Sequence, residues 1–133
     1  FSLLVQTLKS VQNELFNLGT QLASAAGSHS KNLPRLTDDA ILKLESEIDT
    51  SNESLSELTS FVLPGGSVIN ARLHIARNVC RRAERRVVSL LKKENVNPEN
   101  IRYLNRLSDA LFVWSRWVSK IIGDEENLWK PDQ

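Results

Sequence analysis

The sequence predicts an all-α protein, an antiparallel helical bundle of four to five long helices. Four stretches repeat apolar residues at alternating spacings of three and four, as helices with one buried stripe do. Short polar links with proline, glycine or asparagine separate these stretches, and no stretch of useful length alternates as a β-strand would. Long helices that are joined by short links favour antiparallel packing, so the bundle follows from these observations.

The first helix is expected over residues 2–25. Its apolar stripe consists of Leu4, Leu8, Val11, Leu15, Leu18 and Leu22. This stripe is narrow, which is typical of coiled-coil-like packing. The Ala-Ala-Gly run at residues 25–27 is the expected end of the helix, and the polar segment 28–35 with its proline is expected to be a loop.

The second helix is expected to begin at Thr37, which is suited to be an N-cap. Asp38 and Asp39 would interact favourably with the helix dipole. The apolar stripe continues as far as Leu58, and the turn at residues 61–66 (Phe-Val-Leu-Pro-Gly-Gly) is expected to end the helix. The proline and the two glycines of this turn disfavour a helix, and glycine lets the backbone approach a ligand closely.

The third and fourth helices carry clear start and stop signals. Ser67 is suited to cap the third helix, which is expected to run to about Lys93. Asn97 followed by Pro98 is a cap with proline in the first turn, and Gly123 is the expected C-cap of the fourth helix. The segment that follows is acidic and then apolar, and we expect it to pack on the bundle.

The composition is that of one soluble globular domain over residues 1–133, with 41% apolar and 25% charged residues. The formal net charge of +1 provides no global field for a polyanion, and no nucleic-acid-reading motif occurs, so nucleic-acid binding is disfavoured. No apolar run reaches the length of about 18 to 20 residues that crosses a bilayer, and no signal peptide is seen. Cys80 is the only cysteine, which excludes an internal disulfide and fits a reducing compartment. We expect the cytoplasm, or the mitochondrial matrix in a eukaryote.

Charge is distributed unevenly along the chain. Residues 72–93 contain six Arg and two Lys against one Glu, whereas residues 38–57 contain seven acids against one Lys. Arg77, Arg81, Arg85 and Glu84 lie near one another on a strip beside the apolar stripe of the third helix. This strip predicts either a phosphate site, because guanidinium groups hold phosphate oxygens in bidentate pairs, or a salt-bridge network with the acidic second helix. The residues by themselves leave both interpretations open.

Conventional catalytic and metal-ligand sets are absent from the sequence. Neither His29 nor His74 has a metal-ligand partner three or four residues away, so no protein metal site is predicted. Cys80 falls on the apolar stripe and is expected to be a buried structural thiol. Asn105 and Asp109 lie four residues apart beside the core stripe of the fourth helix, and if they are buried there they need polar partners. The arginines opposite or other inter-helix hydrogen bonds would supply them.

Three motifs occur along the chain in a characteristic order and spacing. They are Phe61-Val-Leu-Pro-Gly-Gly66, Ala76-Arg-Asn-Val-Cys-Arg-Arg-Ala-Glu-Arg-Arg86 and Asn105-Arg-Leu-Ser-Asp-Ala-Leu-Phe112. Together they resemble the propanediol-utilisation type of ATP:cob(I)alamin adenosyltransferase, also called corrinoid adenosyltransferase. The resemblance implies a helical-bundle subunit of a homotrimer, with active sites between subunits. It also implies transfer of the 5′-deoxyadenosyl group of ATP to reduced cobalamin, with cobalt as the nucleophile, which accounts for the missing catalytic set.

The resemblance implies roles for individual residues of the third and fourth helices. Arg81 matches the family arginine that contacts the ATP phosphates. Arg77 matches one that forms an inter-subunit salt bridge with an acid near the family's N-terminus. Glu84, Asn105 and Asp109 match further active-site positions, and Asn105 is expected to touch ATP, which would bind together with Mg²⁺.

A role in cobalamin binding is implied for Phe61. It matches the aromatic residue that displaces the lower axial base of cobalamin, and the resulting four-coordinate cobalt(II) is easier to reduce. The resemblance assigns no role to Arg82, Arg85 and Arg86. A cobalamin reductase or an adenosylcobalamin-dependent enzyme is an expected protein partner.

One feature departs from the family pattern. The family's phosphate-cradling loop, rich in Thr, Gly, Asp and Lys, and the acid that pairs with Arg77 precede the first helix, and neither occurs in the 133 residues. We expect either that the sequence omits a segment that is flexible without ATP, or that the protein is truncated and binds ATP weakly. The rival hypothesis is a non-catalytic helical interaction module whose arginine-rich helix binds acidic partner helices.

Overall fold

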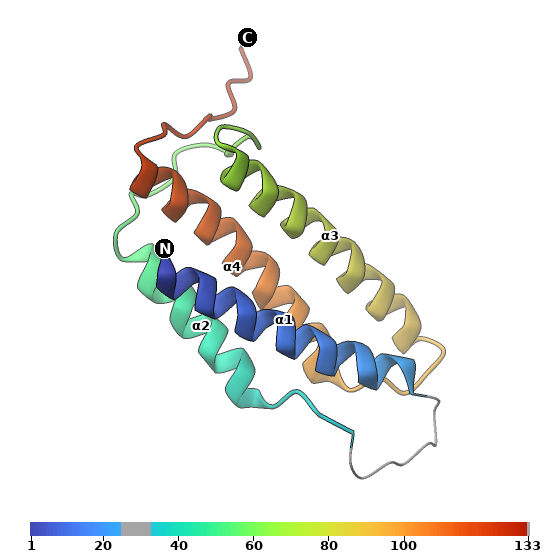
Figure 1. Cartoon of the computed structure of the whole chain (residues 1–133). Helices are drawn as coiled ribbons and strands as arrows, with labels where there is room; N and C mark the ends of the chain where they lie inside the picture. Colours follow the sequence, from blue (N-terminus) through green and yellow to red (C-terminus); the bar gives the residue numbers. More distant parts are fainter. Residues whose placement is uncertain (25–32, 133) are drawn as a thin grey trace.

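The computed structural model describes residues 1–24 and 33–132, and these form four helices (Figure 1). The helices are α1 (Ser2–Ala23), α2 (Asp38–Asn52), α3 (Val68–Leu91) and α4 (Pro98–Ile122). Consecutive helices run in opposite directions, so the predicted all-α antiparallel bundle is confirmed. The one strand-like pairing within the described residues is an isolated bridge between Val62 and Leu128.

The predicted caps of α3 and α4 are confirmed. The Ser67 hydroxyl accepts a hydrogen bond from the Asn70 amide at 3.1 Å, and the Asn97 side chain accepts one from the Glu99 amide at 3.2 Å. These bonds satisfy amide groups that have no partner within the first helical turn. Gly123 closes α4 with a φ of 80°, in the left-handed region that glycine adopts without a steric penalty.

The predicted end of the second helix is wrong. α2 ends at Asn52, whereas its apolar stripe led to an expected end at residues 61–66. Ser51 interrupts that stripe, and serine and asparagine side chains compete for backbone hydrogen bonds. The Ser54 hydroxyl indeed donates to the Ser51 carbonyl at 3.3 Å. Residues 53–66, named here the α2–α3 loop, therefore form a separate segment that leads into α3 (Figure 1).

Smaller differences concern other helix boundaries. Thr37 occupies the N-cap position of α2, but its side chain makes no capping hydrogen bond. α3 ends at Leu91, two residues before its expected end. α1 ends at Ala23, and its expected stop and most of the loop after it, residues 25–32, lie outside the described residues.

α4 is the central helix of the bundle. It packs against both α3 and α2, and 13 of its residues are buried. Trp114, Tyr103 and Val118 are almost completely buried. Cys80 of α3 lies in the same core, where its thiol donates to the Leu104 carbonyl at 3.2 Å, and burial raises the pKa of this thiol to about 11. None of the four described helices combines the length and the apolar character needed to cross a membrane.

The segment after α4, residues 124–132, is named here the tail segment, and it contacts the α2–α3 loop and, through Glu126, Arg116 of α4. The Leu63 amide donates to the Asn127 carbonyl and the Trp129 amide donates to the Phe61 carbonyl, each at 2.7 Å. Both hydrogen bonds join the tail segment to the α2–α3 loop. The two non-helical segments therefore lie side by side at one end of the bundle (Figure 1).

Candidate functional site

Five of the six predicted site residues lie on α3 and α4. Arg77, Arg81 and Glu84 follow one another at spacings of four and three along α3, and Asn105 and Asp109 are four residues apart on α4. α3 and α4 pack against each other in opposite directions, so the later part of α3 faces the earlier part of α4. These five residues are named here the α3–α4 cluster.

Polar contacts connect the cluster across the two helices. The Asn105 side-chain amide donates to a Glu84 carboxylate oxygen at 2.9 Å. The Asn105 oxygen accepts from Arg106 at 2.7 Å, and Arg106 also forms an ion pair with Asp109 at 3.0 Å. Asn105 and Asp109 are exposed, so the burial on which the need for partners depended is not found. Their polar contacts come from Glu84 and Arg106 rather than from the arginines of α3. Arg106 is not among the residues predicted from the sequence, although its place three residues before Asp109 is a signal for this ion pair.

Arg77 is half-buried beside α4. Its guanidinium carbon lies 5.1 Å from the centroid of the Phe112 ring, which is a cation–π distance. Burial lowers the pKa of Arg77, the positive charge of Arg81 lowers it further, and the carboxylate of Asp109 acts in the opposite direction. Arg77 is nevertheless charged at neutral pH, because the pKa of an arginine starts far above 7. The structure thus brings Arg77 within electrostatic reach of Arg81 and Asp109.

Arg81 is exposed, and it forms no ion pair with any described residue. Its charge and that of Arg77 repel each other. An anion bound between the two guanidinium groups would relieve this repulsion and accept charge-assisted hydrogen bonds. The other arginines of α3 are also exposed: Arg72, Arg82, Arg85 and Arg86.

The arginines of α3 do not pair with the acids of α2. Both helices are described along their whole length, and no ion pair joins them. An acid of α2, Asp38, instead pairs with Arg102 of α4 at 3.1 Å. The salt-bridge network between the second and third helices, one of the two interpretations that the sequence left open, is therefore not formed within this chain.

An open hollow with a volume of about 350 Å³ adjoins the cluster. It is lined by Ile41, Glu45, Glu84, Ile101, Arg102, Asn105 and Arg106. Because Glu84 and Asn105 belong both to the cluster and to the hollow, a ligand that contacts them can extend into this space. Another hollow, between α1 and α2 near Glu14, Lys43 and Tyr103, contains none of the predicted site residues.

Phe61 lies apart from the cluster, in the α2–α3 loop. Phe61 precedes the first residue of α3. Arg77 lies about 14 Å further along the axis of this helix than that first residue. The Phe61 side chain is 76% exposed, and its ring meets the Trp129 ring edge to face, with centroids 5.9 Å apart and an interplanar angle of 63°. Gly65 and Gly66 have φ values of 133° and 92°, so glycine is required where the loop turns into α3. Trp129 is not among the site residues predicted from the sequence.

His74 is buried on α3, and the described residues contain no group of side chains suited to hold a metal ion. Burial lowers the pKa of His74, and the positive charge of Arg77 lowers it further, so the ring is neutral at pH 7. Its Nε2 has no hydrogen-bond partner within the described part of the chain. The other histidine, His29, lies outside the described residues.

Comparison with known proteins identifies close relatives of the chain. Residues 2–118 match the family model described as Cobalamin adenosyltransferase. A corrinoid adenosyltransferase from Bacillus subtilis is 43% identical over 128 residues, which cover 95% of this chain and 65% of that protein. One from Mycobacterium tuberculosis is 40% identical over 134 residues, with 96% and 66% covered. Human corrinoid adenosyltransferase MMAB is 39% identical over 127 residues, with 93% and 51% covered. The chain thus spans about half to two thirds of the length of these relatives.

Solved structures share the arrangement of the helices. A variant PduO-type ATP:corrinoid adenosyltransferase from Lactobacillus reuteri, complexed with cobalamin and ATP, superposes with a TM-score of 0.89 at 29% identity, covering 96% of this chain and 71% of that chain. Another variant from the same organism, complexed with ATP, superposes with a TM-score of 0.89 at 30% identity, covering 97% and 72%. The likeness therefore extends over nearly the whole bundle.

Proposed function

Because the chain belongs to the cobalamin adenosyltransferase family, we propose that it transfers the 5′-deoxyadenosyl group of ATP to the cobalt of reduced cobalamin. The products are adenosylcobalamin and inorganic triphosphate. Support comes from the family match over residues 2–118, from relatives named corrinoid adenosyltransferase, and from similar structures complexed with cobalamin and ATP. ATP, accompanied by Mg²⁺, and cobalamin are both substrates in this proposal.

The proposed reaction places modest chemical demands on the protein. Cobalt(I) attacks the 5′-carbon of ATP, a cobalt–carbon bond forms, and the bond from that carbon to the triphosphate oxygen breaks. The substrate supplies the nucleophile, so the protein has to align the two substrates and stabilise the negative charge of the leaving group. A cluster of arginines, a carboxamide and carboxylates, with no activated nucleophile of its own, suits these tasks.

The observation that carries the proposal is the pair of neighbouring arginines, Arg77 and Arg81, beside the hydrogen bond between Glu84 and Asn105. In the proposal, Arg81 binds the ATP phosphates, since it is exposed and free of ion pairs with the described residues. Asn105 touches ATP, and Glu84 orients its carboxamide. Asp109 lies close enough to Arg77 to influence its pKa and holds the neighbouring Arg106 in place.

Phe61 is the proposed cobalamin-facing residue. A large aromatic residue that is 76% exposed, even with Trp129 in edge-to-face contact, leaves apolar area for a ligand to cover. In the proposal, the ring displaces the lower axial base of cobalamin. Its separation from the α3–α4 cluster suits a reaction in which a large corrinoid and a nucleotide occupy adjoining places.

A homotrimer is the proposed assembly. Several apolar side chains on the outer faces of the helices are exposed, which favours contact with other subunits. They include Leu3, Val5, Phe16, Ile75, Val79 and Val88. Arg77 is only half-buried, so it is available for the proposed salt bridge with an acid of a neighbouring subunit. The proposed location is the cytoplasm, or the mitochondrial matrix in a eukaryote, with a cobalamin reductase or an adenosylcobalamin-dependent enzyme as partner.

Calorimetric titration with MgATP, followed by an assay for adenosylcobalamin with chemically reduced cobalamin, tests the proposal. We expect saturable ATP binding and a visible-spectrum change that depends on both substrates. A protein that binds neither ATP nor cobalamin would be contrary to the enzyme hypothesis. Binding of an acidic helical peptide in their place would favour the rival interaction module, because the exposed arginines of α3 are available to either kind of ligand.

A further inference from the structure

Two segments without helical structure hold each other at the end of the bundle that carries Phe61. The Leu63 amide donates to the Asn127 carbonyl, and the Trp129 amide donates to the Phe61 carbonyl, each at 2.7 Å. The Ser60 hydroxyl donates to the Trp129 carbonyl at 2.8 Å. These hydrogen bonds fix the α2–α3 loop and the tail segment relative to each other, but none of them fixes either segment to the helices.

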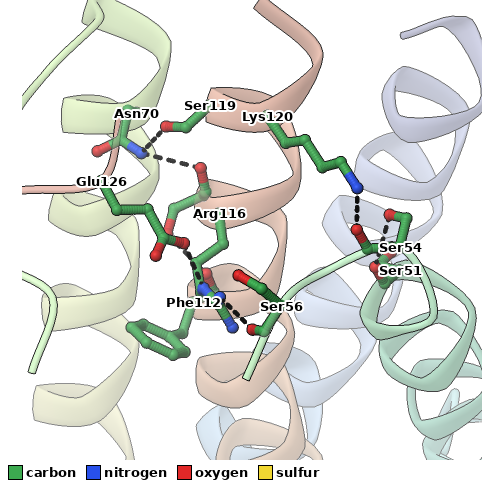
Figure 2. A network of polar contacts seen from close by, with 10 residues as sticks. Ser51, Ser54, Ser56, Asn70, Phe112, Arg116, Ser119, Lys120 and Glu126 are labelled. Carbon is green, nitrogen blue, oxygen red and sulfur yellow. Dashed lines mark hydrogen bonds and ion pairs between the residues drawn. The ribbon is translucent and has the colours of Figure 1, made fainter. Parts of the chain in front are cut away.

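Arg116 of α4 connects both segments to the bundle, as Figure 2 shows. Its Nε donates to a Glu126 carboxylate oxygen of the tail segment at 2.5 Å, and a terminal nitrogen donates to the Ser56 carbonyl of the α2–α3 loop at 2.8 Å. Four residues further along α4, Lys120 donates to the Ser54 carbonyl (Figure 2). One guanidinium group therefore binds the tail segment and the loop at the same time, an arrangement named here the Arg116 clamp.

The ion pair of the clamp differs in burial from the other ion pairs of the described residues. The Arg116 side chain is 7% exposed, whereas the arginines of the other three pairs are 39–66% exposed. Exposed ion pairs contribute little to stability, but removing one partner of a buried pair leaves an uncompensated charge. The native position of Glu126 is therefore strongly favoured over alternatives that leave Arg116 without a carboxylate.

The constraint on Glu126 passes along a short stretch of backbone to Phe61. Glu126 directly precedes Asn127, whose carbonyl accepts from Leu63, and Trp129 is three residues after Glu126. Phe61 has little other support, because its side chain is 76% exposed and its aromatic contact is with Trp129. The place of the Phe61 ring therefore depends on the clamp rather than on the hydrophobic core.

We infer that Arg116 is a positioning residue for the cobalamin side of the site: together with Glu126 it holds the tail segment against the α2–α3 loop and so sets the place of the Phe61 ring. This inference rests on the proposed role of Phe61 in the reaction. The clamp itself is a structural property, so it can be measured without either substrate. Failure of the clamp and failure of the proposed function are therefore distinguishable.

The first experiment compares hydrogen exchange in the wild type and in Glu126→Ala. Glu125→Ala is the matched control, because this neighbouring glutamate is exposed and pairs with no described residue. In Glu126→Ala, we expect the amides of Leu63 and Trp129 to exchange about ten-fold faster, because local opening no longer breaks a buried ion pair. The control should exchange like the wild type. Unchanged protection of these two amides in Glu126→Ala would overturn the inference.

The second experiment measures four-coordinate cob(II)alamin by its visible spectrum in the presence of saturating MgATP. Glu126→Ala should reduce the four-coordinate fraction by about ten-fold. The dissociation constant for ATP should change by less than about two-fold, because the clamp lies away from the α3–α4 cluster. Arg116→Lys keeps a cation beside Glu126 but loses the planar fork that reaches Ser56, so its four-coordinate fraction should fall between those of the wild type and Glu126→Ala.

The outcomes separate positioning from general destabilisation. A selective loss of the four-coordinate species together with faster exchange supports the inference. Equal losses of ATP binding and of the four-coordinate species would show that the clamp only stabilises the fold, and would overturn it. A wild type that forms no four-coordinate species, with faster exchange in Glu126→Ala, would overturn the proposed role of Phe61 and with it the positioning role of Arg116.

Discussion

Replacement of Arg81 by alanine is expected to weaken ATP binding without loss of the fold. The side chain is exposed and makes no ion pair with the described residues, so its removal leaves no buried group without a partner. A hydrogen bond to a charged group contributes about 1.5–3 kcal/mol, and solvent screening places an exposed arginine at the lower end of that range. A loss of about 1.5–2 kcal/mol corresponds to an increase of about 10- to 30-fold in the dissociation constant for ATP.

The neighbouring arginine limits this effect. The charge of Arg81 is one of the causes that lower the pKa of Arg77, so its removal leaves Arg77 with a pKa closer to its ordinary value. The variant therefore keeps one fully charged guanidinium group next to Asp109 and Phe112. We expect weakened binding with a smaller dependence on salt, rather than complete loss of binding.

Calorimetric titration with MgATP at two salt concentrations measures both effects. Arg86→Ala is the matched control, because it removes the same charge from an exposed position of α3 that lies off the strip of Arg77 and Arg81. The control should change the dissociation constant by less than about two-fold. Equal effects of the two substitutions would indicate general attraction by the basic helix, and an unchanged affinity of Arg81→Ala would refute the assignment of Arg81 as a phosphate ligand.

The remaining predictions concern stability, thiol reactivity and the cobalamin side of the site. Asn70→Ala should lower the free energy of unfolding in urea by about 2 kcal/mol relative to the control Asn78→Ala, which changes an exposed residue. The reason is that the buried Asn70 side-chain amide donates two hydrogen bonds to α4 (Figure 2). A difference below about 0.5 kcal/mol would contradict this. Cys80 should resist iodoacetamide at pH 8 until the chain unfolds, because burial raises its pKa to about 11 and keeps the thiol protonated. Rapid labelling of the folded protein would instead show an accessible thiolate. Phe61→Ala should leave the free energy of unfolding within about 0.5 kcal/mol of the wild type, because the ring is exposed. The same variant should form less four-coordinate cob(II)alamin in the presence of ATP. A visible spectrum like that of the wild type would exclude the proposed role of Phe61.

The helix boundaries that local chemistry controls were predictable. Ser67 and Asn97 cap α3 and α4 with side chains that reach an amide two or three residues away, and Gly123 ends α4 in the left-handed region. These interactions need no distant partner, so the residue type and its place before or after an apolar stripe are sufficient to predict them. The end of α2 was not predictable in this way, because Leu58 continues the spacing of the stripe after the helix has ended.

The candidate site was predictable to the extent that helix geometry determines it. Arg77, Arg81 and Glu84 share a strip of α3 because their spacings match the helical turn, and the same holds for Asn105 and Asp109 on α4. Which of these residues bond to one another was decided by the packing of the two helices. The periodicity left a salt-bridge network between α2 and α3 open, whereas in the bundle α4 is the helix that packs against both.

The sequence by itself determined the helical class, the caps of α3 and α4, and the residues that share the polar strips, since these depend on contacts within about four residues of the chain. The tertiary structure alone decided the hydrogen bond between Glu84 and Asn105, the contact of Phe61 with Trp129, and the burial of Arg116 with Glu126. These contacts join residues brought together by the packing of α3 on α4 or by the docking of the tail segment. A chain's periodicity shows which side of each helix is apolar, but not which polar side chains will face one another once those sides are buried.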